Sequence, residues 1–468
     1  MKKKLTFALY FGNRGFFPET LIEGARKEVI ESVSKQGYEF ILPPEGMTKY
    51  GAVESADDGR KYAAWLKENQ GNFDGVILSL PNFGDENGAV PALRDAGVPI
   101  LIQAYPDEIG KMDFESRRDA FCGKFSIMDM FTQFQIPYTV FEPHVVHPST
   151  AAFADNLNEF AAVCRVVNGM KRFTVGAIGA RTTAFKTVRF DEIALEKVGI
   201  TVESFDLSEV FYRADQYVDC NPKMIAKRDR LVCYTDFSKV PEKKIEKLCA
   251  ISVAIDDMIE EYKLDCVAIR CWTEMQSVAG IAPCVLLSEL NDRGIVAACE
   301  LDVCNAVPMY ALQLASGKPA TCLDWNNNYG DDKDKCILFH CGPVAQSLMT
   351  AKGEVIDHKM FAKGGGAGCG WGCNIGNIAD FPMTFASTRT ENGKLIAYLG
   401  EGEITKDPIE KEFFGCGGVS HISDLQKKLL KIGRGGFRHH VSITPGNYEN
   451  ALREAFQVYL KYEIMEIE

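Results

Sequence analysis

The residues best suited to chemistry are two glutamates that each follow a predicted β-strand in the second half of the chain. Glu274 comes after the apolar run Cys266–Ile269, and Glu300 directly follows Ile295–Cys299. A helix predicted over Pro283–Leu290 would join the two strands in a right-handed βαβ unit, so that they run parallel. Both carboxylates would then emerge at one sheet edge, roughly 5–10 Å apart. That spacing suits a divalent cation or a small substrate, whereas the alternative interpretation is two solvated loop glutamates.

Histidine is scarce, with seven residues in 468. His340 ends a predicted strand, 335–340. His439 and His440 are consecutive, so only one of them can point to a given face of a strand. Two carboxylates with one or two imidazoles suit Mn²⁺, Co²⁺ or Fe²⁺. Taken singly, each histidine is interpreted as structural, and the metal hypothesis depends on their combination with the glutamate pair.

The 16 cysteines are unusual for a chain of this size, and twelve of them lie from Cys249 onward. A large chain without a recognisable signal peptide is expected to keep its cysteines as thiols. Cys369 and Cys373 flank Gly-Trp-Gly. No second close pair has the spacing that a four-thiolate site needs, so a metal–thiolate centre is disfavoured there.

Composition places the chain among ordinary globular proteins, with 46% hydrophobic and 25% charged residues. The net charge of −12 argues against nucleic acid as a partner, because phosphate binding requires excess Lys and Arg. No apolar stretch reaches the roughly 18 residues of a membrane span. The apolar run Leu5–Phe11 is short for a signal peptide and fits a first strand better, which favours a cytoplasmic protein.

The elements that position the candidate residues follow from hydrophobic periodicity. Alternating strands and helices predict a parallel, doubly wound α/β sheet, and the pattern restarts near residue 173 to give a second one. A helix is predicted over Thr183–Val198, and another over Val303–Ala315 with an interruption near Pro308. Beyond residue 304, short strands and glycines predict a mostly antiparallel, barrel-like β domain. The predicted domains are 1–165, 166–303 and 304–468.

Several segments together resemble the L-fucose/L-arabinose isomerase superfamily, in its fucose-isomerase-like branch. The resemblance is scattered over most of the chain and is best in the second half. The matching segments are FGNRGFFPE (11–19), SFDLSEV (204–210), RCWTEMQ (270–276), PCVLLSELNDRGIVAACELDV (283–303), LFHCGP (338–343) and RHHVSITPGNYENALRE (438–454).

The resemblance implies two α/β domains and a C-terminal β-barrel-like domain. It also implies a divalent metal, usually Mn²⁺ although Co²⁺, Fe²⁺ or Mg²⁺ could replace it, and a trimer or hexamer with its site at a subunit interface. By carry-over, Glu274 and Glu300 are metal ligands and the acid/base pair, and His440 is a further ligand. His340 matches the remaining imidazole position less closely. Arg14 resembles an arginine that reaches the substrate of a neighbouring subunit.

The hypothesis is an aldose–ketose isomerase working through a cis-enediol, in which one glutamate moves the carbon-bound proton and the other moves the hydroxyl proton. Three further residues, Gln276, Asp302 and His439, are expected to contact sugar hydroxyls or to orient the ligands. The alternatives are a non-enzymatic sugar-binding protein and another metal-dependent sugar lyase or epimerase.

The sugar itself is not fixed by the sequence, including whether it carries a phosphate or a sulfonate. Arg181, Arg389 and Arg438 are interpreted as ordinary surface ions. Six cysteines beside the candidate site are interpreted as small core residues: Cys266, Cys271, Cys284, Cys299, Cys336 and Cys341.

Overall fold

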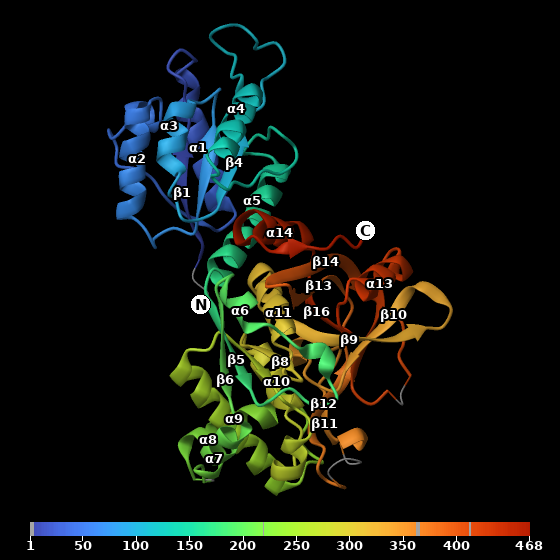
Figure 1. The fold of residues 1–468 in the computed structure, drawn as a ribbon. Coiled ribbons are helices and arrows are strands. Elements are labelled where there is room, and N and C mark those ends of the chain that lie inside the picture. The colour runs from blue at the N-terminus through green and yellow to red at the C-terminus, as the bar shows by residue number, and fades with distance from the viewer. Residues whose placement is uncertain (1–3, 219, 362–365, 411–412) are drawn as a thin grey trace. The chain divides into compact units, whose positions relative to one another are not determined.

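Two parallel sheets and one closed antiparallel barrel make up the fold (Figure 1). The structure is a computed structural model that describes residues 4–218, 220–361, 366–410 and 413–468. The chain divides into two units. Unit 1 comprises residues 1–168 and 453–460, and unit 2 comprises residues 169–452 and 461–468.

Unit 1 is built on a four-stranded parallel sheet whose strands are almost wholly apolar. In spatial order the strands are β2 (Glu39–Ile41), β1 (Thr6–Phe11), β3 (Gly75–Leu80) and β4 (Ile100–Ala104). Strands β1, β3 and β4 are buried, as expected when helices cover a parallel sheet, whereas the short edge strand β2 is partly exposed. The helices are α1 (Thr20–Lys35), α2 (Ala56–Glu68), α3 (Glu86–Leu93), α4 (Ala120–Gln133) and α5 (Ala151–Met170).

Unit 2 begins with a second four-stranded parallel sheet, which carries the candidate site at its strand ends. In spatial order the strands are β6 (Ile200–Phe205), β5 (Phe173–Ile178), β7 (Cys266–Ile269) and β8 (Val296–Cys299). The larger helices are α7 (Leu207–Asp215), α8 (Pro222–Tyr234), α9 (Glu242–Tyr262), α10 (Cys284–Asp292) and α11 (Val303–Ser316). Because β7 and β8 are paired neighbours, the predicted βαβ unit is confirmed.

Six antiparallel strands of unit 2 close into a barrel, because β14 pairs with both β13 and β15. Around the barrel they are β15 (Cys416–His421), β10 (Asp332–His340), β9 (Thr321–Tyr329), β16 (His440–Pro445), β13 (Phe381–Glu391) and β14 (Lys394–Ile404). The shorter strands β11 (Glu354–Asp357), β12 (Trp371–Asn377) and β17 (Glu463–Ile464) extend this sheet. Helices α13 (Leu425–Arg434) and α14 (Glu449–Glu454) follow β15 and β16 in the chain. The predicted fold class, two α/β domains and an antiparallel β domain, is therefore confirmed.

Helix α11 passes through Pro308 without the predicted interruption. Proline removes the amide that would bond to the carbonyl four residues earlier, which here is that of Cys304. The hydroxyl of Thr388, from barrel strand β13, donates to this carbonyl at 2.6 Å. A tertiary contact that no local pattern encodes thus replaces the missing hydrogen bond.

The helix predicted over Thr183–Val198 is wrong for most of its length. The structure has only a short 3-10 turn, Lys186–Val188, and helix α6 (Glu192–Glu196). Asp191 caps α6 by accepting a hydrogen bond from the amide of Ala194 at 3.2 Å. The capping residue starts a new helix in the middle of the predicted one.

The predicted domain boundaries stay predictions. Residue 165 falls within α5, and residue 303 is the first residue of α11. Across the described ranges, none of the helices combines the length and apolarity that crossing a membrane requires.

Candidate functional site

Glu300 stands at the point where β8 ends and the chain turns toward α11. Its backbone and that of Leu301 are left-handed, with φ of 61° and 60°. This conformation costs side-chain-bearing residues on the order of 1 kcal/mol each, so the surroundings must enforce it. The amide of Leu301 donates to the carbonyl of Ile269 in β7 at 3.1 Å, and that of Asp302 to Cys299 at 3.0 Å. The turn holds the Glu300 side chain in a buried position, 6% exposed.

Two barrel strands bring His440 and Asp324 to the same place. His440 is the first residue of β16 and is paired in register with Asp324 of β9. The Nε2 atom of His440 lies 3.3 Å from Oε2 of Glu300 and 3.4 Å from Oδ1 of Asp324. A glutamate from the parallel sheet thus meets a histidine and an aspartate from the barrel.

Four buried polar atoms at this site have no hydrogen-bond partner in the described part of the chain: Glu300 Oε2, Asp324 Oδ1, His340 Nε2 and His440 Nε2. Buried polar groups are normally satisfied, so a cluster of unsatisfied ones calls for a ligand. Two carboxylate oxygens and imidazole nitrogens are ligands that suit Mn²⁺, Fe²⁺ or Co²⁺. The donor set therefore fits the divalent cation that the sequence predicts.

A second layer of side chains orients His440. Fully buried Asp302 lies 2.7 Å from Nδ1 of His440 and accepts a hydrogen bond from Nη1 of Arg438 at 2.6 Å. An ionised carboxylate can only accept, so Nδ1 carries a proton, and Nε2 is the ring atom that faces Glu300 and Asp324. The interpretation of Arg438 as a surface ion is wrong, because it is 5% exposed and forms a buried ion pair.

The electrostatics of the cluster keep its buried acids ionised. Burial acts to raise the pKa of the Asp302 carboxyl, but Arg438 and His440 outweigh it and lower the pKa to about 2. Burial likewise opposes ionisation of Glu300, yet His440 and His340 hold its pKa below the ordinary value. Burial lowers the pKa of His340, which favours a neutral imidazole that is able to bind a cation.

Glu274 does not join this cluster. Its carboxylate pairs with Nε of Arg270 at 2.5 Å and accepts a hydrogen bond from the amide of Thr273 at 2.9 Å. Its side chain is 41% exposed. Nearby Gln276 is buried and donates to the carbonyls of Cys271 and Ile281 at 2.8 and 3.2 Å. The Glu274 carboxylate and the Gln276 amide nitrogen thus have protein partners, whereas the buried Gln276 Oε1 has none in the described part of the chain.

The other predicted site residues fall in different places. His439 borders the cluster, with Nε2 3.6 Å from Oδ1 of Asp324 and a side chain that is 46% exposed. Arg14 belongs to unit 1, where its Nε donates to the carbonyl of Gly84 at 3.0 Å and its guanidinium pairs with Glu86. The guanidinium also lies 3.9 Å from the centre of the Phe83 ring.

Asp324 was not identified from the sequence. It lies in the strand segment Thr-Cys-Leu-Asp-Trp, where residues alternate between the two faces. A charged residue on the same face as buried Cys322 is the signal that could have singled it out.

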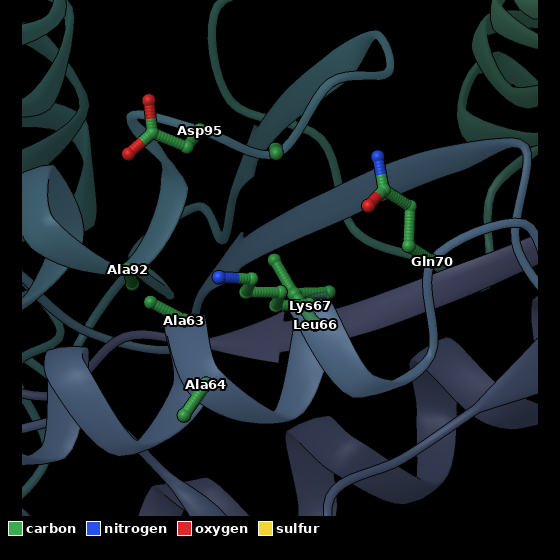
Figure 2. Close-up of a pocket in the computed structure, with 8 residues that line it drawn as sticks. Ala63, Ala64, Leu66, Lys67, Gln70, Ala92 and Asp95 are labelled. Atoms are coloured by element: carbon green, nitrogen blue, oxygen red, sulfur yellow. The ribbon is translucent and has the colours of Figure 1, made fainter.

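A pocket of about 450 Å³ in unit 1 lacks comparable chemistry (Figure 2). Residues of α2 and α3 and those that directly follow them line it, among them Ala63, Lys67 and Asp95. The histidine, cysteine and carboxylate groups that could hold a metal ion within the described ranges all lie in unit 2 instead. We therefore place the candidate site at the Glu300 cluster.

Comparisons with known proteins give family matches in both the N-terminal and the C-terminal part of the chain. Residues 8–171 match the N-terminal domain of fucose/sulfoquinovose isomerases, and residues 338–468 match the C-terminal domain of L-fucose isomerase. A sulfoquinovose isomerase from Priestia aryabhattai is 22% identical over 425 residues, covering 88% of this chain and 89% of the relative. One from Alkalicoccus urumqiensis is 25% identical over 415 residues, covering 86% and 88%.

A solved ABC-transporter periplasmic solute-binding protein from Actinobacillus succinogenes with bound D-allose aligns with 67% of this chain and 93% of its own, at 12% identity. The TM-score of this alignment is 0.18.

The two domain matches, together with the relatives that span most of the chain, define an isomerase. The chain belongs to the L-fucose isomerase-like superfamily.

Proposed function

We propose that this chain is a metal-dependent aldose–ketose isomerase that converts the sulfonated aldose sulfoquinovose into its 2-ketose. The observation that carries the catalytic part is the convergence of unpartnered buried oxygen and nitrogen atoms from Glu300, Asp324 and His440. The choice of sugar comes from the relatives, which are sulfoquinovose isomerases over 86–88% of this chain.

Glu300, Asp324 and His440 would hold the cation, with His340 and His439 beside it. A divalent cation at this position supplies Lewis-acid polarisation of the two sugar oxygens at C1 and C2. We favour Mn²⁺ because carboxylate ligands dominate the site. Metal dependence explains why four buried polar atoms lie at this site without hydrogen-bond partners in the described ranges.

The two carboxylates would share the proton transfers of a cis-enediol pathway. Glu300, with a side chain 8% exposed, takes the C2 proton and returns it to C1, because its buried carboxylate is held ionised and can accept a proton. Asp324, 22% exposed, moves the hydroxyl proton. Glu274, the acid/base partner expected from the sequence, is replaced by Asp324 in this proposal because Arg270 already neutralises Glu274.

Two further predictions stay part of the proposal. The resemblance implies a trimer or hexamer in which Arg14 reaches the site of a neighbouring subunit, where a guanidinium could bind the sulfonate. Arg14→Ala should then raise KM for sulfoquinovose while leaving Mn²⁺ binding unchanged.

The protein is expected to be cytoplasmic.

The test is incubation of the Mn²⁺-loaded protein with sulfoquinovose in D₂O, followed by NMR. We expect a ketose product with deuterium at C1, because the transferred proton exchanges with solvent on the carboxylate. L-Fucose and L-arabinose serve as competing substrates. Turnover of L-fucose without turnover of sulfoquinovose would reject the substrate and keep the reaction class, whereas no turnover of any aldose would reject both.

A further inference from the structure

A thiol and two imidazoles meet directly beside the proposed cation site. Cys322, His340 and His440 are all buried, and the Cys322 Sγ and one ring nitrogen of each histidine lie within 4.8 Å of one another. They come from three neighbouring barrel strands: β9 supplies Cys322, and its partners β10 and β16 supply the histidines. The juxtaposition is therefore built into the barrel and does not depend on a loop.

The hydrogen bonds leave the same atom of each histidine available. Nδ1 of His340 accepts from the amide of Cys341 at 2.9 Å, and Nδ1 of His440 is occupied by Asp302. The Nε2 atoms of both rings are buried and have no hydrogen-bond partner in the described ranges. These two unsatisfied nitrogens are an observation, independent of the thiol, that points to a ligand.

The chemistry of this group differs from that of the carboxylate cluster. One thiolate and two imidazoles suit Zn²⁺ and related soft cations, which accept three protein ligands and a solvent molecule. Glu300 and Asp324, by contrast, supply hard oxygen ligands that suit Mn²⁺. Both sets need His440 Nε2, and one nitrogen lone pair binds one cation.

We infer that Cys322, His340 and His440 form a second cation site that takes thiophilic divalent cations such as Zn²⁺ and Cd²⁺ and excludes the catalytic cation by capturing His440. Binding releases the Cys322 proton to solvent and forms a metal–sulfur bond, with no change of oxidation state. The inference rests on the cation site of the proposed function, because His440 is shared. It predicts inhibition by thiophilic cations that excess Mn²⁺ reverses.

The experiment is a Cd²⁺ titration of the metal-stripped protein, followed by the ultraviolet charge-transfer absorption of the thiolate–Cd²⁺ bond, with and without Mn²⁺. Other thiols also lie close together, such as Cys271 and Cys299 with Sγ atoms 3.2 Å apart. The diagnostic signal is therefore the part of the absorption that Mn²⁺ displaces. Mn²⁺ at about 100 times its dissociation constant should weaken apparent Cd²⁺ binding at this site about 100-fold by mass action.

Two variants sharpen the result. Cys322→Ser should lose the Mn²⁺-sensitive absorption. Cys336→Ser, which alters a buried thiol of the same barrel that contacts Ser420, should retain it. A Mn²⁺-sensitive band that survives in Cys322→Ser would overturn the inference.

If Cys322→Ser does not fold, the wild type still decides, because a band wholly insensitive to saturating Mn²⁺ would also reject a shared histidine. The readout is optical, so the inference can fail while Mn²⁺-dependent isomerisation stands. Conversely, loss of isomerisation would leave the Cd²⁺ result interpretable.

Discussion

Strands β7 and β8 are similar, but the glutamates that follow them lie in different surroundings. Both strands are short and buried, they pair in parallel, and each is followed by a glutamate. After β8, the left-handed turn at Glu300 buries the carboxylate, and Oε2 has no hydrogen-bond partner among the described residues. After β7, four residues separate the strand from Glu274, and Arg270 neutralises its carboxylate.

The difference shows that a carboxylate at a strand end is not a site by itself. What distinguishes Glu300 is that the barrel places His440 and Asp324 beside it, while none of the barrel residues that the structure describes donates a hydrogen bond to its Oε2. A candidate site at this sheet edge is therefore marked by two features together: carboxylate and imidazole groups that lie close to one another, and buried polar atoms that have no hydrogen-bond partner among the described residues.

The largest expected effect tests the β8 end. Glu300→Gln and Asp324→Asn should each lower kcat by about 10³-fold or more, since each removes a cation ligand and an acid/base group. Steady-state assays with sulfoquinovose at saturating Mn²⁺ measure this. Wild-type rates in either variant would contradict the assignment of that residue.

The second effect tests the layer behind His440. Asp302→Asn should weaken Mn²⁺ binding about 10–100-fold, because the amide no longer fixes the proton on Nδ1. Histidine ¹⁵N NMR should show a changed tautomer, which a merely structural loss would not produce. The variant also leaves Arg438 buried without its counter-charge, at a cost of roughly 3–5 kcal/mol in stability.

Glu289→Gln is the matched control for Asp302→Asn. Glu289 is fully buried and paired with Lys227 and Arg293, outside the cation cluster. It should lose stability but keep Mn²⁺ affinity. Equal loss of affinity in both variants would mean that Asp302 acts only through stability.

A half-buried carboxylate in unit 1, that of Glu454, shows the effect of burial on a pKa. Burial raises the pKa of Glu454 in unit 1 to about 7. Because the folded pKa exceeds the unfolded one, the folded state binds the proton more tightly, and stability falls as pH rises between the ordinary value and about 7. Glu454→Gln should therefore be more stable than wild type by about 3 kcal/mol at pH about 8, and nearly equal to it at pH about 4.

Denaturant unfolding at several pH values checks this prediction, with exposed Glu39→Gln of the same unit as the control. A stability difference for Glu454→Gln that does not vary with pH would show that folding does not shift the pKa of Glu454.

The smallest effect belongs to the β7 end. Glu274→Gln should change kcat less than about threefold and stability by at most about 1 kcal/mol, since the ion pair with Arg270 is partly exposed. A large loss of kcat with unchanged KM would restore Glu274 to the catalytic role that the sequence suggested.

Much of the fold could be predicted, because hydrophobic periodicity reports strands and helices directly. Periodicity did not predict that α11 continues through Pro308, because the hydroxyl of Thr388 in a distant strand bonds to its free carbonyl. It also did not predict the break within Thr183–Val198, where Asp191 caps a separate helix. The six cysteines predicted to lie in the core are buried, except Cys341, which is partly exposed.

The site was predictable only in part. Glu300 and His440 were identified from their places at strand ends and in the superfamily motifs. Asp324 lies inside a strand without a motif, and only the pairing of β9 with β16 sets it opposite His440. The neutralisation of Glu274 depends on the side-chain positions of both partners, which strand periodicity does not report.

The most direct test of the central claim is the Mn²⁺ stoichiometry of three proteins, measured from the EPR signal of free Mn²⁺ during titration. We predict one tightly bound Mn²⁺ per chain in the wild type and in Glu274→Gln, and none in Asp324→Ala. Loss of binding in Glu274→Gln with full binding in Asp324→Ala would contradict the account.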